Sequence, residues 1–142
     1  MKNRNLILTL GIISISLMSF TFSNPLSVQD KDGEERTDKT TLKARELVEE
    51  AAPDDWMTYA KAAEKCLNKG VNLKEAAGWL DTSIEIKETA FNLELKGDYF
   101  VSNNLPDKAL EYYVKTLKVG KEQDFNFDAR DIQKKIADIH LN

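Results

Sequence analysis

Cys66 and His140 are the two side chains best suited to nucleophilic or acid–base chemistry, and the chain holds one residue of each type. A nucleophilic thiol needs a base or positive charge beside it to lower its pKa. Cys66 instead falls on the apolar stripe of a helical pattern, with Lys65 and Lys69 expected to point outward. His140 falls in the last turn of the last predicted helix, where the helix dipole favours it, and no partner is spaced to act with it. We therefore predict no catalytic residues, a chain that is not an enzyme, and a buried Cys66.

Metal and cofactor motifs are equally poor. Residues 30–34, DKDGE, approach a calcium-binding loop, but the glycine comes two positions too early and no bidentate glutamate follows. One histidine and one cysteine do not provide zinc-ligand spacing. Glycines 70, 78 and 97 are isolated, so no phosphate-binding loop is present. We predict no metal and no cofactor, and we interpret residues 30–34 as a solvated spacer.

The first 23 residues have the layout of a secretory signal. Lys2 and Arg4 precede an uncharged, mainly apolar run that reaches Phe22, and small residues follow at the expected cleavage position. Cleavage after Ser23 would release the chain to the periplasm or the exterior. The alternative is an uncleaved N-terminal membrane anchor facing the periplasm, because the apolar run approaches the length needed to span a bilayer.

Charge excludes several kinds of partner. The chain carries 20 basic and 24 acidic side chains, a net charge of −4 that becomes about −6 without Lys2 and Arg4. An acidic chain with interspersed signs lacks the basic surface that nucleic acid requires. It also shows no run of basic residues for anionic lipid, so we predict no membrane contact unless the signal is retained.

Residues 24–53 are predicted to be a linker with a possible short helix. Residues 24–40 are polar and charged, with too few apolar side chains to offset the entropy of ordering. Leu42, Leu47, Val48 and Ala51 then give a weak helical stripe that Pro53 ends. This stripe is either a short helix docked on the domain or a helical extension of the linker.

Residues 54–142 show helical periodicity almost throughout and no strand pattern, so the fold class is all-α. We expect Asp54 or Asp55 to begin the first helix and Gly70 to end it. Asn72 should begin the next helix in a capping box with Glu75. The first helix should run to about residue 69, and the third and fifth are expected at approximately 88–103 and 127–140. The fourth should have Pro106 in its first turn and Gly120 just beyond its end.

The second and fourth of these helices align at an offset of 33 residues. Three of the pairs are Ala76 with Ala109, Trp79 with Tyr112, and Ser83 with Thr116. The helices before them align at an offset of 34, which pairs Ala63 with Gly97. A repeat near this length is typical of a helical solenoid, in which small residues mark where two helices cross closely.

This pattern resembles the tetratricopeptide repeat. Gly97, Phe100, Ala109, Tyr113 and Thr116 follow that family's order of small and aromatic positions, whereas the first hairpin departs from it by having Cys66 and Leu80 in place of aromatic residues. The resemblance implies two repeats of a helical hairpin over residues 54–142, with the fifth helix as a C-terminal cap. The isoleucines of that cap would cover the second hairpin, while its charged side chains, Lys135 among them, would face water.

Residues 55–142 also resemble the C-terminal helical tail of a family of secreted bacterial proteins of unknown function. The resemblance rests on the stretches DWMTYAKAAEKCL, LKEAAGWLDTSIEIKETAFNLELKGDYF and PDKALEYYVKTLKVGK. Members of that family usually carry a β-rich domain before the tail. Here a linker stands in its place, which leaves any function of the β-rich domain out of reach. The family resemblance itself implies no known activity.

Tetratricopeptide repeats imply protein or peptide binding on the concave face, which the first helix of each hairpin supplies. We therefore expect an exported, non-catalytic interaction module. The alternative is an accessory or remnant domain of a secreted enzyme whose catalytic part is on another chain. The candidate partner-binding residues are Lys61, Glu64, Glu94, Asp98 and Ser102.

Overall fold

The computed structural model describes residues 38–141, in which six α-helices and no strands are found. The helices are α1 (Lys39–Glu49), α2 (Trp56–Lys69), α3 (Leu73–Ile86), α4 (Ala90–Ser102), α5 (Pro106–Gln123) and α6 (Arg130–Leu141). This confirms the all-α class for the described part of the chain. The signal segment, residues 30–34 and the start of the linker lie outside it. In residues 38–141, no helix combines the length and the apolar character that crossing a membrane requires.

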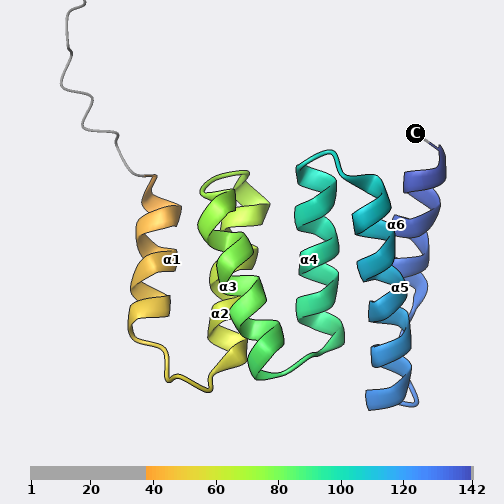
Figure 1. The fold of residues 1–142 in the computed structure, drawn as a ribbon, viewed down its shortest axis with the longest axis horizontal. Coiled ribbons are helices and arrows are strands. Elements are labelled where there is room, and N and C mark those ends of the chain that lie inside the picture. Colours follow the sequence, from red (N-terminus) through yellow and green to blue (C-terminus); the bar gives the residue numbers. More distant parts are fainter. Residues whose placement is uncertain (1–37, 142) are drawn as a thin grey trace, which may run out of the picture. The chain divides into compact units, whose positions relative to one another are not determined.

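The helices follow one another side by side in chain order (Figure 1). The most extensive packing joins α2 to α3 and α4 to α5. α4 also contacts both α2 and α3, and α6 packs on α5. α4 therefore lies between the first helix pair and α5.

The short helix expected near residue 41 is α1, and it is docked on α2. Its first turn is capped by Asp38, whose carboxylate accepts hydrogen bonds from the backbone N–H groups of Thr40 and Thr41. Ala44 has no exposed surface, and Arg45 donates two hydrogen bonds, of 2.8 and 3.0 Å, to the carboxylate of Glu75 on α3. Of the two alternatives for this stretch, the structure therefore shows the docked helix.

The ends of α2 and the start of α3 follow the predicted signals with one exception. Asp55 caps α2 by accepting the Thr58 N–H at 3.1 Å, and Gly70 ends it with φ of +64°. Asn72 precedes α3, but its side chain accepts no helix N–H, so the predicted capping box with Glu75 is wrong. The Asn72 amide instead donates to the Glu75 carboxylate at 2.8 Å, because Asn72 has a left-handed backbone with φ of +50°.

Pro106 occupies the first turn of α5 as predicted, but the predicted end of this helix at Gly120 is wrong. Gly120 is buried inside α5, which continues to Gln123. A Cβ atom at Gly120 would lie 2.6 Å from Cε1 of Phe127, so glycine here makes room for an aromatic ring. A sequence alone does not distinguish a glycine that ends a helix from a glycine inside a helix that makes room for a neighbouring side chain.

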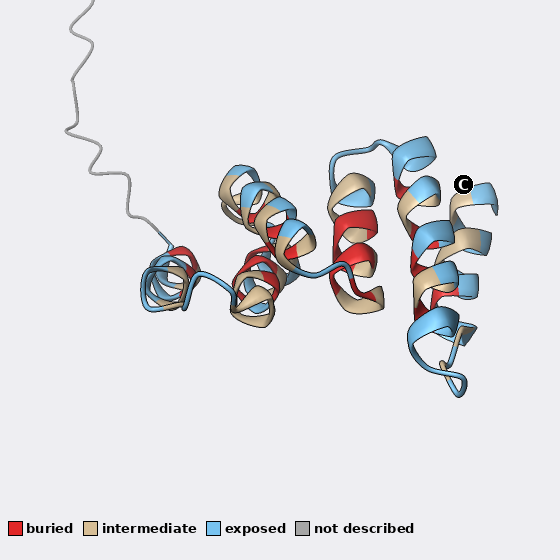
Figure 2. Ribbon diagram, turned by 60° about the horizontal axis from the view of Figure 1, so that its bottom comes forward, coloured by how far each residue is buried: buried red, intermediate tan, exposed pale blue. Residues whose placement is uncertain are grey.

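The interior consists mainly of small side chains where helices cross. Ala63, Ala76, Gly97 and Ala109 are all buried, as the spacing predicted. Larger side chains complete the core around them, including Leu80, Leu93, Tyr113 and Ile132. Figure 2 shows that burial extends around much of α4, which agrees with its place between neighbours.

A buried polar network joins the ends of three helices. Asn92 of α4 donates to the Ser83 hydroxyl at 3.0 Å and to the Lys87 carbonyl at 2.7 Å. Its own side-chain oxygen accepts the Thr89 N–H at 2.9 Å, which completes a capping box. Ser83 donates in turn to the carbonyl of Trp56, at the start of α2. This network positions α4, which carries the residues described next.

Candidate functional site

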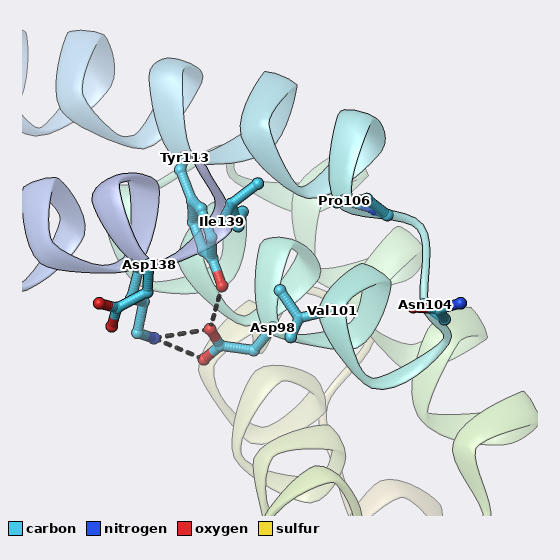
Figure 3. Close-up of a pocket in the computed structure, with 8 residues that line it drawn as sticks. Asp98, Val101, Asn104, Pro106, Tyr113, Asp138 and Ile139 are labelled. Atoms are coloured by element: carbon cyan, nitrogen blue, oxygen red, sulfur yellow. Dashed lines mark hydrogen bonds and ion pairs between the residues drawn. The ribbon is translucent and has the colours of Figure 1, made fainter. Parts of the chain in front are cut away.

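Glu94 and Asp98 lie one turn apart on α4, and both accept hydrogen bonds from the ammonium group of Lys135. The Nζ atom of Lys135, on α6, donates to Oε1 of Glu94 at 2.8 Å and to the two oxygens of Asp98 at 2.6 and 2.8 Å. The Tyr113 hydroxyl, from α5, donates to Oδ1 of Asp98 at 2.7 Å. Asp98 therefore joins α4, α5 and α6 at one point. In Figure 3, dashed lines mark the contacts of Asp98 with Tyr113 and with Lys135.

This arrangement corrects the expectation that Lys135 faces water. Its side chain is 33% exposed, close to the exposed fractions of its two carboxylate partners. Burial alone would lower the pKa of Lys135, but the hydrogen bonds and charges of Asp98 and Glu94 outweigh it and raise that pKa above its usual value. Lys135 is therefore charged at neutral pH and holds α6 against α4.

Tyr113 is held in its neutral form by the same site. Burial raises the pKa of its hydroxyl, and the hydrogen bond to Asp98 raises it further. The hydroxyl therefore keeps its proton, and donates it to Asp98, at alkaline pH values where an exposed tyrosine would ionise.

The other candidate partner residues are less constrained. Ser102 is exposed, and its hydroxyl donates to the backbone carbonyl of Asp98 at 2.9 Å. Lys61 is exposed and Glu64 is half-buried, both on α2. Glu94, Asp98 and Ser102 thus share one face of α4, while Lys61 and Glu64 belong to another helix. Whether any of them contacts a partner remains a prediction.

A cleft of about 520 Å³ opens beside the Asp98 contact. Its walls combine apolar surface with a few polar groups (Figure 3). They are formed by Asp98, Val101, Asn104, Pro106, Tyr113, Lys135, Asp138 and Ile139. The cleft is therefore built from the end of α4, the start of α5 and the face of α6.

The chemistry of the cleft suits binding. Val101 is 49% exposed, and with Pro106 and Ile139 it provides apolar contact area. Asp98 and Asp138 contribute two carboxylates against the single ammonium group of Lys135, which gives the lining a net negative charge. An extended chain with an aliphatic side chain and a nearby basic or donor group would match this surface.

The two residues with potential reactivity lie elsewhere. Cys66 is buried in α2, and burial raises the pKa of its thiol, which disfavours the nucleophilic thiolate. His140 is exposed on the last turn of α6. Within residues 38–141, no group of three or more His, Cys, Asp or Glu side chains is placed to hold a metal ion.

Sequence reasoning named Asp98 as a candidate contact residue but did not indicate that Tyr113 and Lys135 would lie against it. Lys135 is separated from Asp98 by 37 positions, and Tyr113 by 15. Tyr113 was visible as a core position of a repeat, and nothing in its spacing signalled the hydroxyl contact. Lys135 carried no local signal either, because its neighbours on α6 include other charged side chains.

Comparison of the chain with protein-family models, with curated proteins and with solved structures gives no match.

Proposed function

We propose that this chain is an exported, non-catalytic module that binds a protein or peptide through tetratricopeptide-like helical hairpins. The pairing of α2 with α3 and of α4 with α5 supports two successive hairpins. Positions that align at the repeat offset have the same environment, since Ala76 and Ala109 have no exposed surface, nor have Ser83 and Thr116. In this proposal α6 is the capping helix, with Ile132 buried against the second hairpin.

The observation that carries the proposal is the cleft formed by α4, α5 and α6. It joins apolar walls to a fixed carboxylate. Of the three helices that line it, α4 is the one that the repeat interpretation would use for binding, and α5 and α6 complete the walls. The partner would be an extended segment with an aliphatic side chain for Val101 and Ile139 and a basic group for the negative lining. A short groove of this kind supports modest affinity, so additional contacts from α2 would be needed for tight binding.

Export is proposed from the sequence of residues 1–23 alone, which lie outside the described residues. Fractionation of cells that produce the full chain tests this part. Mature protein that begins at residue 24 in the periplasm or medium would support cleavage. A full-length chain in the inner membrane would support the anchor, and a cytoplasmic chain would contradict both.

Two exposed valines provide a matched test of the binding site. Val101 lines the cleft and is 49% exposed, whereas Val114 on α5 lies outside the cleft and is 54% exposed. Peptides would be selected from a displayed random library on the wild-type protein and then measured against Val101→Glu and Val114→Glu. We expect the first variant to lose at least about tenfold in affinity, because the aliphatic side chain of the partner would meet a charged carboxylate in place of the apolar surface of Val101. The second variant should bind as the wild type does.

Equal binding by both variants would place the peptide site elsewhere on the molecule. Failure to select any peptide, together with the absence of a cross-linked partner at position 101 in intact cells, would contradict the binding module itself.

A further inference from the structure

Four lysines from α1 and α2 line a second cleft, of about 490 Å³. Lys39 and Lys43 are one turn apart on α1, and Lys65 and Lys69 are one turn apart on α2. Thr40 and Asn68 complete the lining and add hydroxyl and amide groups. The cleft lies on helices other than those of the α4–α5–α6 site.

The antiparallel arrangement of the two helices brings these lysines together. α1 begins, and α2 ends, at the same end of the pair (Figure 1). The positive charge of Lys69 interacts with the carboxylate of Asp38, the residue that caps α1. The start of α1 and the end of α2 therefore lie close together. All four lysines are exposed, so their ammonium groups are open to solvent.

Within the described part of the chain, no ion pair balances the charge of the cleft. In residues 38–141, the cations with a carboxylate partner are Arg45, Lys96, Arg130 and Lys135, and none of the four cleft lysines is among them. Like charges one helical turn apart destabilise a helix, and here this spacing occurs on both sides of one cleft. Asp38 lies near Lys69, and its carboxylate is engaged with the backbone of Thr40 and Thr41.

We propose that the cleft between α1 and α2 binds a multiply charged phosphate-bearing anion. Each lysine supplies a compact ammonium charge with three hydrogen-bond donors, which suits the oxygens of phosphate groups. Binding would relieve the repulsion between the lysine pairs, so the anion should stabilise the folded chain. The helix N-terminus makes no direct contribution, because Asp38 already accepts the first N–H groups of α1. A monovalent anion would neutralise too little of this charge for comparable binding.

The source of the phosphate is either a soluble anion or a phospholipid headgroup, and two measurements separate them. The first is titration of the purified full-length chain with tripolyphosphate at low salt, followed by calorimetry and thermal unfolding. The second is co-flotation with phosphatidylcholine vesicles with and without phosphatidylglycerol. Its readout is the difference in the fraction of protein bound to the two kinds of vesicle.

The variant is Lys43→Gln with Lys65→Gln, and the control is Lys118→Gln with Lys121→Gln, which removes the same charge from exposed positions of α5. We expect the cleft variant to bind at least about tenfold more weakly in one of the two measurements, while the control variant binds as the wild type does. Loss with tripolyphosphate identifies a soluble anion, and loss confined to the charged vesicles identifies a headgroup. Equal weakening in both variants, or no binding in either measurement, would overturn the proposal. The far-ultraviolet circular dichroism of both variants checks that each is folded.

Discussion

The ring of Tyr113 lies directly against the backbone of Gly97, where α5 crosses α4. A Cβ atom at position 97 would lie 2.6 Å from Cδ1 of that ring, well inside van der Waals contact. The ring cannot easily move aside, because it is buried and its hydroxyl donates to Asp98 at 2.7 Å. Gly97 is therefore required by close packing, despite the cost of glycine in a helix interior.

The first prediction follows from this contact. Gly97→Ala should lower the free energy of unfolding, because a Cβ atom only 2.6 Å from Cδ1 of the ring places the cost of overpacking towards the upper end of about 1–3 kcal/mol, above the gain in helix propensity of about 1 kcal/mol. Chemical denaturation measures the change. Gly78→Ala is the control, since no atom lies within 4 Å of a Cβ at exposed position 78 of α3, and it should stabilise the protein. If Gly97→Ala were stabilising to the same extent as the control, the close approach of α4 and α5 would be wrong.

The second prediction concerns Lys135. Lys135→Met keeps an apolar stem but leaves the carboxylates of Glu94 and Asp98 without their shared cation. We expect a loss of about 1 kcal/mol in unfolding free energy, a value reduced by partial solvent exposure, with faster hydrogen exchange in α6. Lys134→Met, at a neighbouring exposed position, is the control and should have little effect. The loss should shrink at high salt, and a salt-independent loss would indicate a cause other than charge.

The third prediction is a loss of stability at alkaline pH. Folding raises the pKa of both Tyr113 and Lys135, so their stabilising contribution is complete below the unfolded-state values of about 10 and declines as the pH rises through the folded-state values. Urea denaturation at pH 8 and pH 10.5 should show this decline. Tyr113→Phe removes one of the two groups, so its decline between the two pH values should be smaller. An identical decline in the variant would show that Tyr113 does not contribute.

The fourth prediction tests the buried network at the start of α4. Asn92→Ala removes the partners of the Thr89 N–H and the Lys87 carbonyl and should cost about 2–3 kcal/mol in unfolding free energy. Asn103→Ala, at the opposite end of α4, is the control, because Asn103 is exposed and its side-chain amide donates only to the Tyr99 carbonyl of the same helix. If both variants lowered the unfolding free energy by similarly small amounts, water would be taking over the hydrogen bonds that the Asn92 side chain makes.

The fifth prediction concerns Cys66, the single cysteine of the chain. Its thiol is buried and burial raises its pKa, so a thiol reagent should modify the folded protein far more slowly than the protein in urea. Absorbance of the released reagent group measures both rates. Equal rates in the folded and unfolded protein would contradict the packing of α2.

Much of the helical framework was predictable because its signals are local. Asp55 and Gly70 bound α2 through hydrogen bonds and backbone angles that involve only nearby residues. The small residues at positions 63, 76, 97 and 109 also indicated burial correctly, since their spacing keeps them on one face of each helix. By contrast, Gly120 was wrongly predicted to lie beyond the helix end. The reason for a glycine there is the ring of Phe127, which packs against it from the segment after α5.

The sequence by itself determined the helix class, most helix boundaries and the positions that pack at the crossings, because helix periodicity and capping depend on neighbours along the chain. The tertiary structure alone decided that Lys135 joins Glu94 and Asp98, and that lysines from α1 and α2 share one cleft. Such contacts depend on how helices cross and on which side chains then meet. The distances involved are set by packing between elements, so no local pattern records them.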